Sequence, residues 1–231
     1  MITVVAYFTA GTAYEREVVL LTRSLERAGM AHRVESIRDR GSWDANTAEK
    51  VHVISRAREE IAGPLLYVDA DAFVHENCEG YFDALTCDFA AHWFAGPAKG
   101  HVRSDVCGCV AGGVCTKPHR FLSGTMYFGD TDGARHLLRC WADLNEFRQR
   151  MGHLDGGGQR NLWATLETIG HELDFVKMPG RYCYVFDKPW AYPTDEPCII
   201  EHTIASRENP GRVTTDMGRR HRIRQLRKLV A

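Results

Sequence analysis

The sequence predicts a single α/β domain in which a mostly parallel central sheet is flanked by helices. Three observations lead to this fold class. Apolar segments rich in β-formers alternate along the chain with longer segments whose apolar residues recur at helical spacing. Strands and helices that alternate in this way form parallel sheets with helical crossovers. A chain of 231 residues is also long enough to bury a large core as one domain without disulfide bonds.

The first half of the chain supplies a β-α-β-α-β order. An apolar face of Val18, Leu21 and Leu25 indicates the first helix, and Gly29 ends it. The predicted elements, in order, are a strand over residues 2–9, a helix from Tyr14 to Ala28, a strand over 32–37, a helix capped by Asn46 and Thr47 that runs to Ile61 after a loop over 41–44, and an apolar strand that begins at Leu65 after a Gly-Pro break.

The second half continues with shorter elements around a glycine-rich stretch. The predicted elements are a short helix over residues 81–85, a strand over 89–93, an irregular cysteine- and glycine-rich inserted loop over 95–119, a strand over 121–128, and helices over 133–149 and 159–169. We expect the domain to span residues 1–206. We expect residues 207–231 to form a basic C-terminal tail or helix.

The composition is that of an ordinary globular protein and excludes some classes. The formal charge of −1 points to no particular partner, and no run is long enough to span a bilayer. The apolar start at residues 1–8 is too short for a signal peptide and lacks a basic leader. We therefore expect a soluble, cytoplasmic protein.

Two carboxylates at the end of the third strand are the most informative feature. Asp69 and Asp71 follow an apolar run, so they are expected at the carboxyl edge of the sheet, where open α/β sheets bind ligands. On an extended segment, side chains two residues apart point the same way. Two hard oxygen donors suit Mn²⁺ or Mg²⁺, which can in turn hold a diphosphate. The alternative is an ordinary strand end followed by a turn, where Asp is common.

The eight cysteines include one cluster. Cys107, Cys109 and Cys115 lie in the glycine-rich loop, with His101 before them and His119 after them. Three thiols and a histidine can complete a tetrahedral structural Zn²⁺ site, for which Cys107, Cys109, Cys115 and His119 are the candidates. The Cys-x-Cys spacing is not the usual knuckle, so unliganded loop thiols are the other interpretation.

The tail after Ser206 is the one charge-biased region. Its arginines and lysine outnumber its acidic residues. Such a tail can contact phosphate in nucleic acid or at a membrane surface. The alternative is a solvated helix or partly ordered end packed by Ile223, Leu226 and Leu229.

Five segments in order resemble those of nucleotide-sugar glycosyltransferases with the GT-A fold. The segments are Phe8–Tyr14, Trp43–Lys50, Leu66–Asp71, Leu122–Phe128 and Ile199–His202. They are similar to the uridine-binding loop, the segment before the second crossover helix, the Asp-x-Asp motif, the sugar-facing strand and the late metal-site strand of glycogenin-like and lipopolysaccharide galactosyltransferase-like enzymes. The large loop over 95–119 departs from that pattern.

This resemblance implies a set of site residues. Asp69, Asp71 and His202 would bind Mn²⁺ or Mg²⁺, and Asp71 and Asp155 are the catalytic candidates. The donor, with a UDP-sugar favoured, would contact Thr9, Ala10, Tyr14, Lys50, Asp69, Ser123, Gly124 and Arg207. The family often pairs Asp with Gln where a helix opens toward the acceptor, whereas here three glycines separate Asp155 from Gln159.

The function that follows is metal-dependent transfer of a sugar from a nucleotide-diphosphate donor to an acceptor hydroxyl. The basic tail and the cysteine-rich loop make a modified DNA base one candidate acceptor. A sugar-nucleotide pyrophosphorylase is an alternative, but it needs a glycine-rich basic phosphate loop, and the segment 10–13 is short and lacks a lysine. The other alternative is a non-catalytic binding module that carries zinc.

Overall fold

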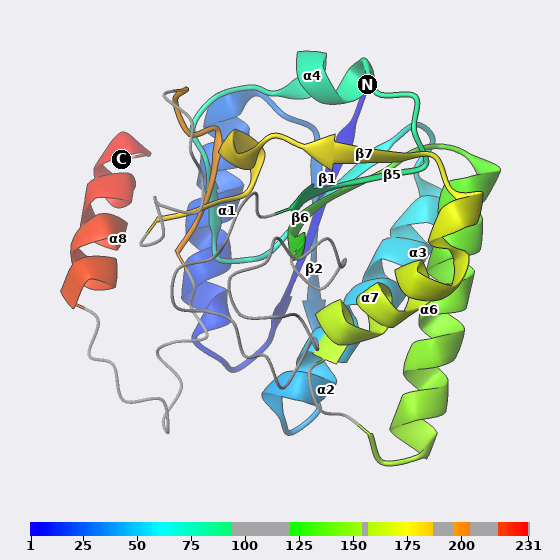
Figure 1. Ribbon diagram of the computed structural model, residues 1–231. Coiled ribbons are helices and arrows are strands. Elements are labelled where there is room, and N and C mark those ends of the chain that lie inside the picture. The colour runs from blue at the N-terminus through cyan, green and yellow to red at the C-terminus, as the bar shows by residue number, and fades with distance from the viewer. Residues whose placement is uncertain (94–120, 154–156, 187–195, 204–216, 231) are drawn as a thin grey trace, which may run out of the picture.

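The computed structural model describes residues 1–93, 121–153, 157–186, 196–203 and 217–230. Its main feature is a six-stranded sheet (Figure 1). The strand order is β2-β1-β3-β6-β5-β7, and only β6 runs against the other five. The prediction of a mostly parallel sheet is therefore confirmed. The strands are β1 (Thr3–Thr9), β2 (His32–Ile37), β3 (Leu65–Val68), β5 (Phe89–Trp93), β6 (Phe121–Phe128) and β7 (Phe175–Met178).

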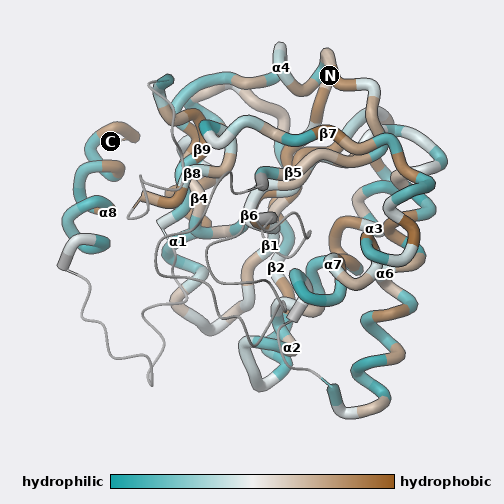
Figure 2. Tube along the Cα trace, viewed as in Figure 1, coloured by the Kyte–Doolittle hydropathy of each residue, from teal (hydrophilic) through white to brown (hydrophobic). Residues whose placement is uncertain are grey.

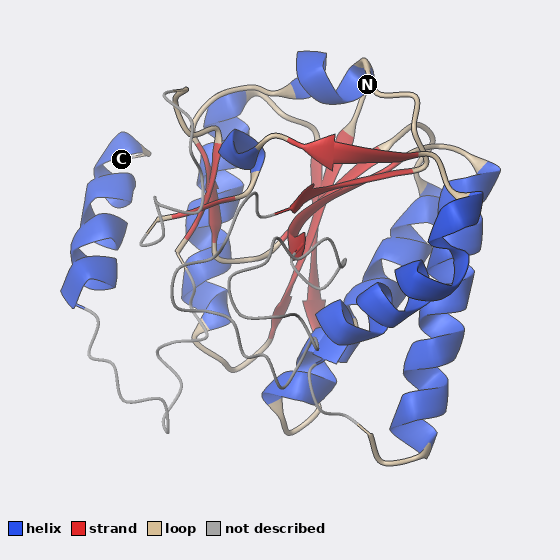
Figure 3. Ribbon diagram, viewed as in Figure 1, coloured by secondary structure: helices blue, strands red, loops and turns tan. Residues whose placement is uncertain are grey.

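Helices cover both faces of this sheet (Figure 3). They are α1 (Tyr14–Ala28), α2 (Trp43–Ala48), α3 (Lys50–Glu60), α4 (Glu79–Asp83), α6 (Asp132–Arg150) and α7 (Gly157–Ile169), with short 3-10 turns at Gly170–Glu172 and Gly180–Tyr182. Because neighbouring strand residues point to opposite faces, β1 contributes to two cores. Val4 and Ala6 pack with Leu21 of α1, whereas Val5 and Tyr7 pack beneath α3, α6 and α7.

Hydropathy follows the same layers (Figure 2). Hydrophobic residues run along the central strands, whereas α6 and α8 (Met217–Leu229) mix hydrophilic and hydrophobic positions. Within the described ranges, no helix combines the length and the apolar composition needed to cross a bilayer.

The helix predicted to begin at Asn46 begins earlier, so that prediction was wrong. Ser42 has extended backbone, and its side chain accepts a hydrogen bond from the Ala45 amide, which makes it the cap of α2. The Asn46 side chain instead accepts from Arg40 N and donates to Asp39. The chain therefore enters two short helices, and the junction between α2 and α3 places Lys50 at the start of α3.

A small second sheet lies beside the carboxyl end of β3. It has the order β4-β9-β8, with strands β4 (Ala72–Val74), β9 (Ile200–His202) and β8 (Tyr184–Val185). Strand β9 runs antiparallel to β4 and parallel to β8. This pairing brings the late strand of the chain to the residues that follow Asp71.

The basic tail contains α8, which packs against α1 and β4 (Figure 1). Ile223 and Leu226 are buried with Leu20 of α1 and Phe73 of β4, as expected from the apolar spacing. Leu229 was expected to pack with them, but it is 48% exposed because it lies in the last turn of the helix.

Candidate active site

The Asp-x-Asp motif forms a turn at the end of β3. The Asp69 amide donates to Gly124 O on β6 at 2.8 Å, and the Ala72 amide donates back to Asp69 O at 3.0 Å. The expectation that Asp69 and Asp71 share one side of an extended segment was therefore wrong. Their carboxylates approach one another because the backbone turns between β3 and β4.

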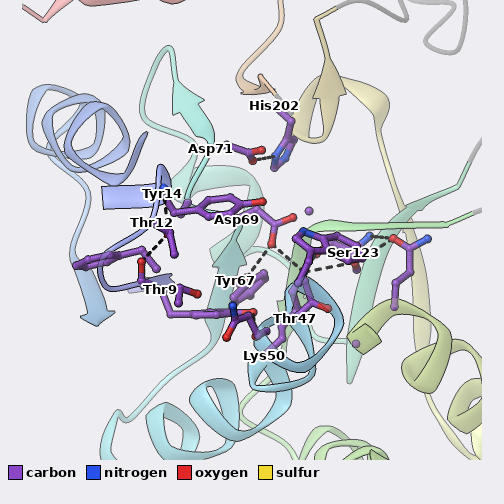
Figure 4. Close-up of a pocket in the computed structure, with 18 of the residues that line it drawn as sticks. Thr9, Thr12, Tyr14, Thr47, Lys50, Tyr67, Asp69, Asp71, Ser123 and His202 are labelled. Carbon is purple, nitrogen blue, oxygen red and sulfur yellow. Dashed lines mark hydrogen bonds and ion pairs between the residues drawn. The ribbon is translucent and has the colours of Figure 1, made fainter. Parts of the chain in front are cut away.

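This turn brings both carboxylates to a histidine on β9. The candidate ligand atoms of Asp69, Asp71 and His202 all lie within 4.8 Å of one another. His202 Nδ1 lies 3.8 Å from Asp71 Oδ1 (Figure 4). Two carboxylate oxygens and an imidazole nitrogen are a donor set that suits Mn²⁺ or Mg²⁺. The residues present therefore fit the divalent cation that the sequence predicts.

His202 is held in place by β6. Its side chain is buried, and Thr125 Oγ1 lies 2.8 Å from its Nε2, so Nδ1 is the nitrogen that faces Asp71. A Cβ added to Gly124 would lie 2.9 Å from His202 Cε1, so the imidazole packs directly on the glycine. Burial lowers the pKa of His202, but Cys183 and Asp71 outweigh it and raise the pKa to about 10. A cation that binds the imidazole must therefore displace a proton.

Lys50 lies inside this site. Its Nζ donates to Asp69 Oδ1 at 2.8 Å and to Ser123 O at 3.0 Å, and the residue is only 5% exposed. The Tyr67 hydroxyl also donates to Asp69 Oδ1 at 2.8 Å. A lysine at the start of a helix is usually solvated. Here the ammonium group adds a fixed positive charge beside the carboxylates, as Figure 4 shows for Lys50 and Asp69.

A cavity of about 460 Å³ opens from these residues toward the carboxyl end of β1. Thr9, Tyr14 and Trp43 line it. Burial, and then the Asp71 charge, raise the pKa of Tyr14, so its hydroxyl stays protonated. Two aromatic rings in a cavity with polar groups at one end can hold a base and its phosphates. Ala10 is not among the described residues that line the cavity, and its amide donates to a carbonyl of β2.

Ser123, Gly124 and Gln159 form the wall on the β6 side. Gln159 Oε1 accepts from Ser123 Oγ at 3.0 Å and from Ser123 N at 3.3 Å. Gly158 permits the close approach of this helix start to α2, because a Cβ there would lie 2.7 Å from Thr47 O.

Sequence reasoning did not include Tyr67, Trp43 or Gln159 in the site. Tyr67 could have been found, because a residue two positions before Asp69 shares its side of a strand. Gln159 was left out because three glycines separate it from Asp155, whereas the resembling family often has Asp and Gln as a pair.

Several predicted site residues lie outside the described part of the chain. They are Asp155, Arg207 and the four candidate zinc ligands Cys107, Cys109, Cys115 and His119. Their roles remain predictions.

No family model matches the chain, and no curated protein matches its sequence. Solved structures do match its fold. A glycosyltransferase involved in the glycosylation of the major capsid of PBCV-1 is 13% identical, with a TM-score of 0.61, over 98% of each chain. The galactosyltransferase LgtC, in complex with donor and acceptor sugar analogues, is 13% identical, with a TM-score of 0.58, over 98% of this chain and 95% of its own.

Mouse xyloside xylosyltransferase 1 is 13% identical, with a TM-score of 0.52, over 91% of this chain and 100% of its own. The chain has the GT-A fold. All of these matched structures are glycosyltransferases, and the fold prediction made from the five sequence segments is thereby confirmed.

Proposed function

We propose that this chain is a glycosyltransferase that uses a nucleoside-diphosphate sugar and a divalent cation. One observation carries the proposal: the ligand atoms of Asp69, Asp71 and His202 converge within 4.8 Å at one end of the cavity. The fold supports the same class, because the matched structures are glycosyltransferases and one of them holds donor and acceptor sugar analogues.

The chemical requirement is stabilisation of the negative charge that develops on the departing diphosphate. A Mn²⁺ or Mg²⁺ ion bound by Asp69, Asp71 and His202 would supply Lewis-acid charge at that point. The buried Lys50 ammonium adds charge that is already in position before substrate binds. Gly124 has no side chain, and the imidazole of His202 packs into the space that a side chain would take.

The donor is best matched by a UDP-sugar. The cavity beyond the cation site holds Tyr14 and Trp43 as aromatic surfaces and Thr9 as a polar group at the end of β1. The resemblance of the Phe8–Tyr14 segment to a uridine-binding loop favours uracil, and Tyr14 is the residue that would stack on it. Arg207 would contact the phosphates.

The acceptor hydroxyl would approach past Ser123 and Gln159, whose side chains line the cavity wall. The resemblance to glycogenin-like enzymes favours retention of configuration. Inversion would instead need a carboxylate base, for which Asp155 is the candidate. A modified DNA base is one acceptor to test. The basic tail supports a DNA acceptor less than its sequence suggests, because two of its arginines, Arg219 and Arg222, already pair with Glu17 and Glu201 within the chain.

The test is a screen of nucleotide sugars with Mn²⁺, in which release of the nucleoside diphosphate is measured with and without sugar acceptors and modified duplex DNA. We expect one donor to be cleaved or transferred, and chelation of the metal to stop the reaction. Asp71→Asn is the matched inactive variant. Cleavage that persists with chelator and in Asp71→Asn would contradict the proposal. Stoichiometric zinc without nucleotide binding would instead favour the binding module.

A further inference from the structure

A buried arginine of the C-terminal helix reaches the site from outside the cavity. Arg219 lies in the first turn of α8 and is 2% exposed. Its Nε donates to Thr203 O at 2.8 Å, and its guanidinium pairs with Glu17 of α1 at 2.8 Å. A guanidinium removed from water must be paired and hydrogen-bonded, so these contacts determine where it lies.

Thr203 connects this arginine to the Asp-x-Asp turn. Its amide and its hydroxyl both lie 3.0 Å from Asp71 O and donate to it. The same hydroxyl lies 3.4 Å from a guanidinium nitrogen of Arg219. Thr203 also directly follows His202 in the sequence. One residue therefore joins the backbones of two of the three candidate metal ligands, and Arg219 holds that residue.

This position differs from the part of α8 that docks the helix. Ile223 and Leu226 supply the apolar contact with α1 and β4. Arg222 lies one turn from Arg219 and pairs with Glu201 of β9, the residue that directly precedes His202. Among the described residues, Arg222 bonds to Glu201 and Gln225 and so joins the same helix to β9 by another residue, which makes it a matched control.

We propose that Arg219 is a positioning residue for the cation site and sets the separation of Asp71 and His202 through Thr203. This inference rests on the proposed function, because it assigns the cation to those ligands. It also means that α8 helps to position the cation ligands, although the sequence predicts that this helix belongs to a separate basic tail.

The experiment compares Arg219→Met and Arg222→Met in the full chain. Calorimetry measures Mn²⁺ binding in the presence of UDP, thermal unfolding measures stability, and hydrogen exchange without any ligand measures protection around residues 69–74 and 200–203. We expect both variants to lower the melting temperature. Only Arg219→Met is expected to weaken Mn²⁺ binding by roughly tenfold or more and to speed exchange of the Thr203 amide. Arg222→Met should stay within about twofold of the original affinity.

Equal loss of Mn²⁺ affinity in both variants, or unchanged affinity in Arg219→Met, would overturn the inference. If the original chain binds neither Mn²⁺ nor UDP, the proposed function fails, and the hydrogen-exchange result alone decides whether Arg219 orders the turn. If Arg219→Met does not fold, Thr203→Val replaces it. That variant keeps the Arg219–Glu17 pair and loses the hydroxyl bond to Asp71 O, so a several-fold weaker Mn²⁺ affinity is expected, and an unchanged affinity would overturn the inference.

Discussion

Two clusters of metal-binding residue types lie on either side of strand β9, and they differ in what occupies their carboxylates. Asp69, Asp71 and His202 form one, and His75, Cys198 and Glu201 form the other, each with ligand atoms within 4.8 Å of one another. Glu201 and His202 are consecutive, so they point to opposite faces of the strand.

In the second cluster, an arginine already occupies both oxygens of the carboxylate. Arg222 donates to both oxygens of Glu201 at 2.6 Å, and His75 Nε2 lies 2.8 Å from one of them. In the first cluster, Lys50 and Tyr67 both donate to a single oxygen of Asp69. The bidentate guanidinium occupies both oxygens of Glu201, so neither is available to a cation. We therefore expect a cation to bind at the first cluster, although both clusters hold residue types that bind metals.

The largest expected effect separates the two clusters directly. Asp71→Asn keeps the side-chain shape but removes the charge, so we expect sugar transfer to fall about 10²–10³-fold, measured as nucleoside diphosphate released per enzyme. Glu201→Gln changes the other cluster and should lower the melting temperature while leaving Mn²⁺ affinity unchanged. A loss of Mn²⁺ binding in Glu201→Gln alone would reverse the assignment.

The next effect comes from the contact between Gly124 and His202. Gly124→Ala places a Cβ 2.9 Å from His202 Cε1, so the imidazole or the strand beneath it must shift and the ligand geometry changes. We expect Mn²⁺ affinity in calorimetry to fall about 10–100-fold and stability to fall by about 1–3 kcal/mol. Gly80→Ala is the control, because its Cβ would meet no atom within 4 Å. Unchanged Mn²⁺ affinity in Gly124→Ala would show that His202 is not a ligand of the cation.

A smaller effect should follow loss of the hydrogen bond on His202 Nε2. Thr125→Val keeps the volume and removes the hydroxyl, which orients the ring from 2.8 Å. We expect Mn²⁺ affinity to fall roughly tenfold. Thr165→Val removes another buried hydroxyl bond, to Asn161 O in α7, and should leave the affinity unchanged. If both variants lose affinity to the same extent, the effect is general destabilisation.

Substitutions in the second cluster should have the smallest effect on Mn²⁺ affinity. They should change the stability of the fold and its dependence on pH. Burial raises the pKa of Glu201, but the hydrogen bonds from Arg222 and His75 hold it below the ordinary 4.5. The folded pKa is therefore the lower one, so the pair stabilises the fold above pH 4.5 and loses that contribution as the pH falls through the folded pKa. Arg222→Gln should lower stability at neutral pH by about 1–3 kcal/mol.

Thermal unfolding followed from neutral to acid pH checks this. The original chain should lose stability more steeply than Arg222→Gln as the pH falls below 4.5. Parallel curves for the two proteins would show that the ion pair contributes nothing.

Much of the fold could be predicted because its signals are local. The helix Tyr14–Ala28 and the strands over 32–37, 89–93 and 121–128 have the predicted bounds, since periodicity and glycine breaks mark them. The start of α2 was missed because Ser42, and not Asn46, caps it. The second sheet was missed because β9 is three residues long and pairs with a strand more than a hundred positions earlier.

The site was predictable only in part, for the same reason. Asp69 and Asp71 follow an apolar strand, which periodicity detects. Burial of Lys50 depends on Asp69 and Ser123, which other elements supply, so its own surroundings in the sequence gave no sign of it. The role proposed for Arg219 depends on its contacts with Glu17 of α1 and with Thr203, which directly follows β9. These contacts are distant in the sequence, so nothing in the basic tail distinguishes Arg219 from the arginines beside it.

Pulsed EPR of Mn²⁺ bound to the full chain with UDP tests whether the cation lies at the Asp-x-Asp site. We expect one ion to show both ¹⁴N coupling from a histidine and ³¹P coupling from the diphosphate. His202→Ala should remove the nitrogen signal, whereas His75→Ala should leave both signals. A nitrogen signal that survives His202→Ala and disappears in His75→Ala, or bound Mn²⁺ without phosphorus coupling, would contradict the assignment of the cation to the Asp-x-Asp site.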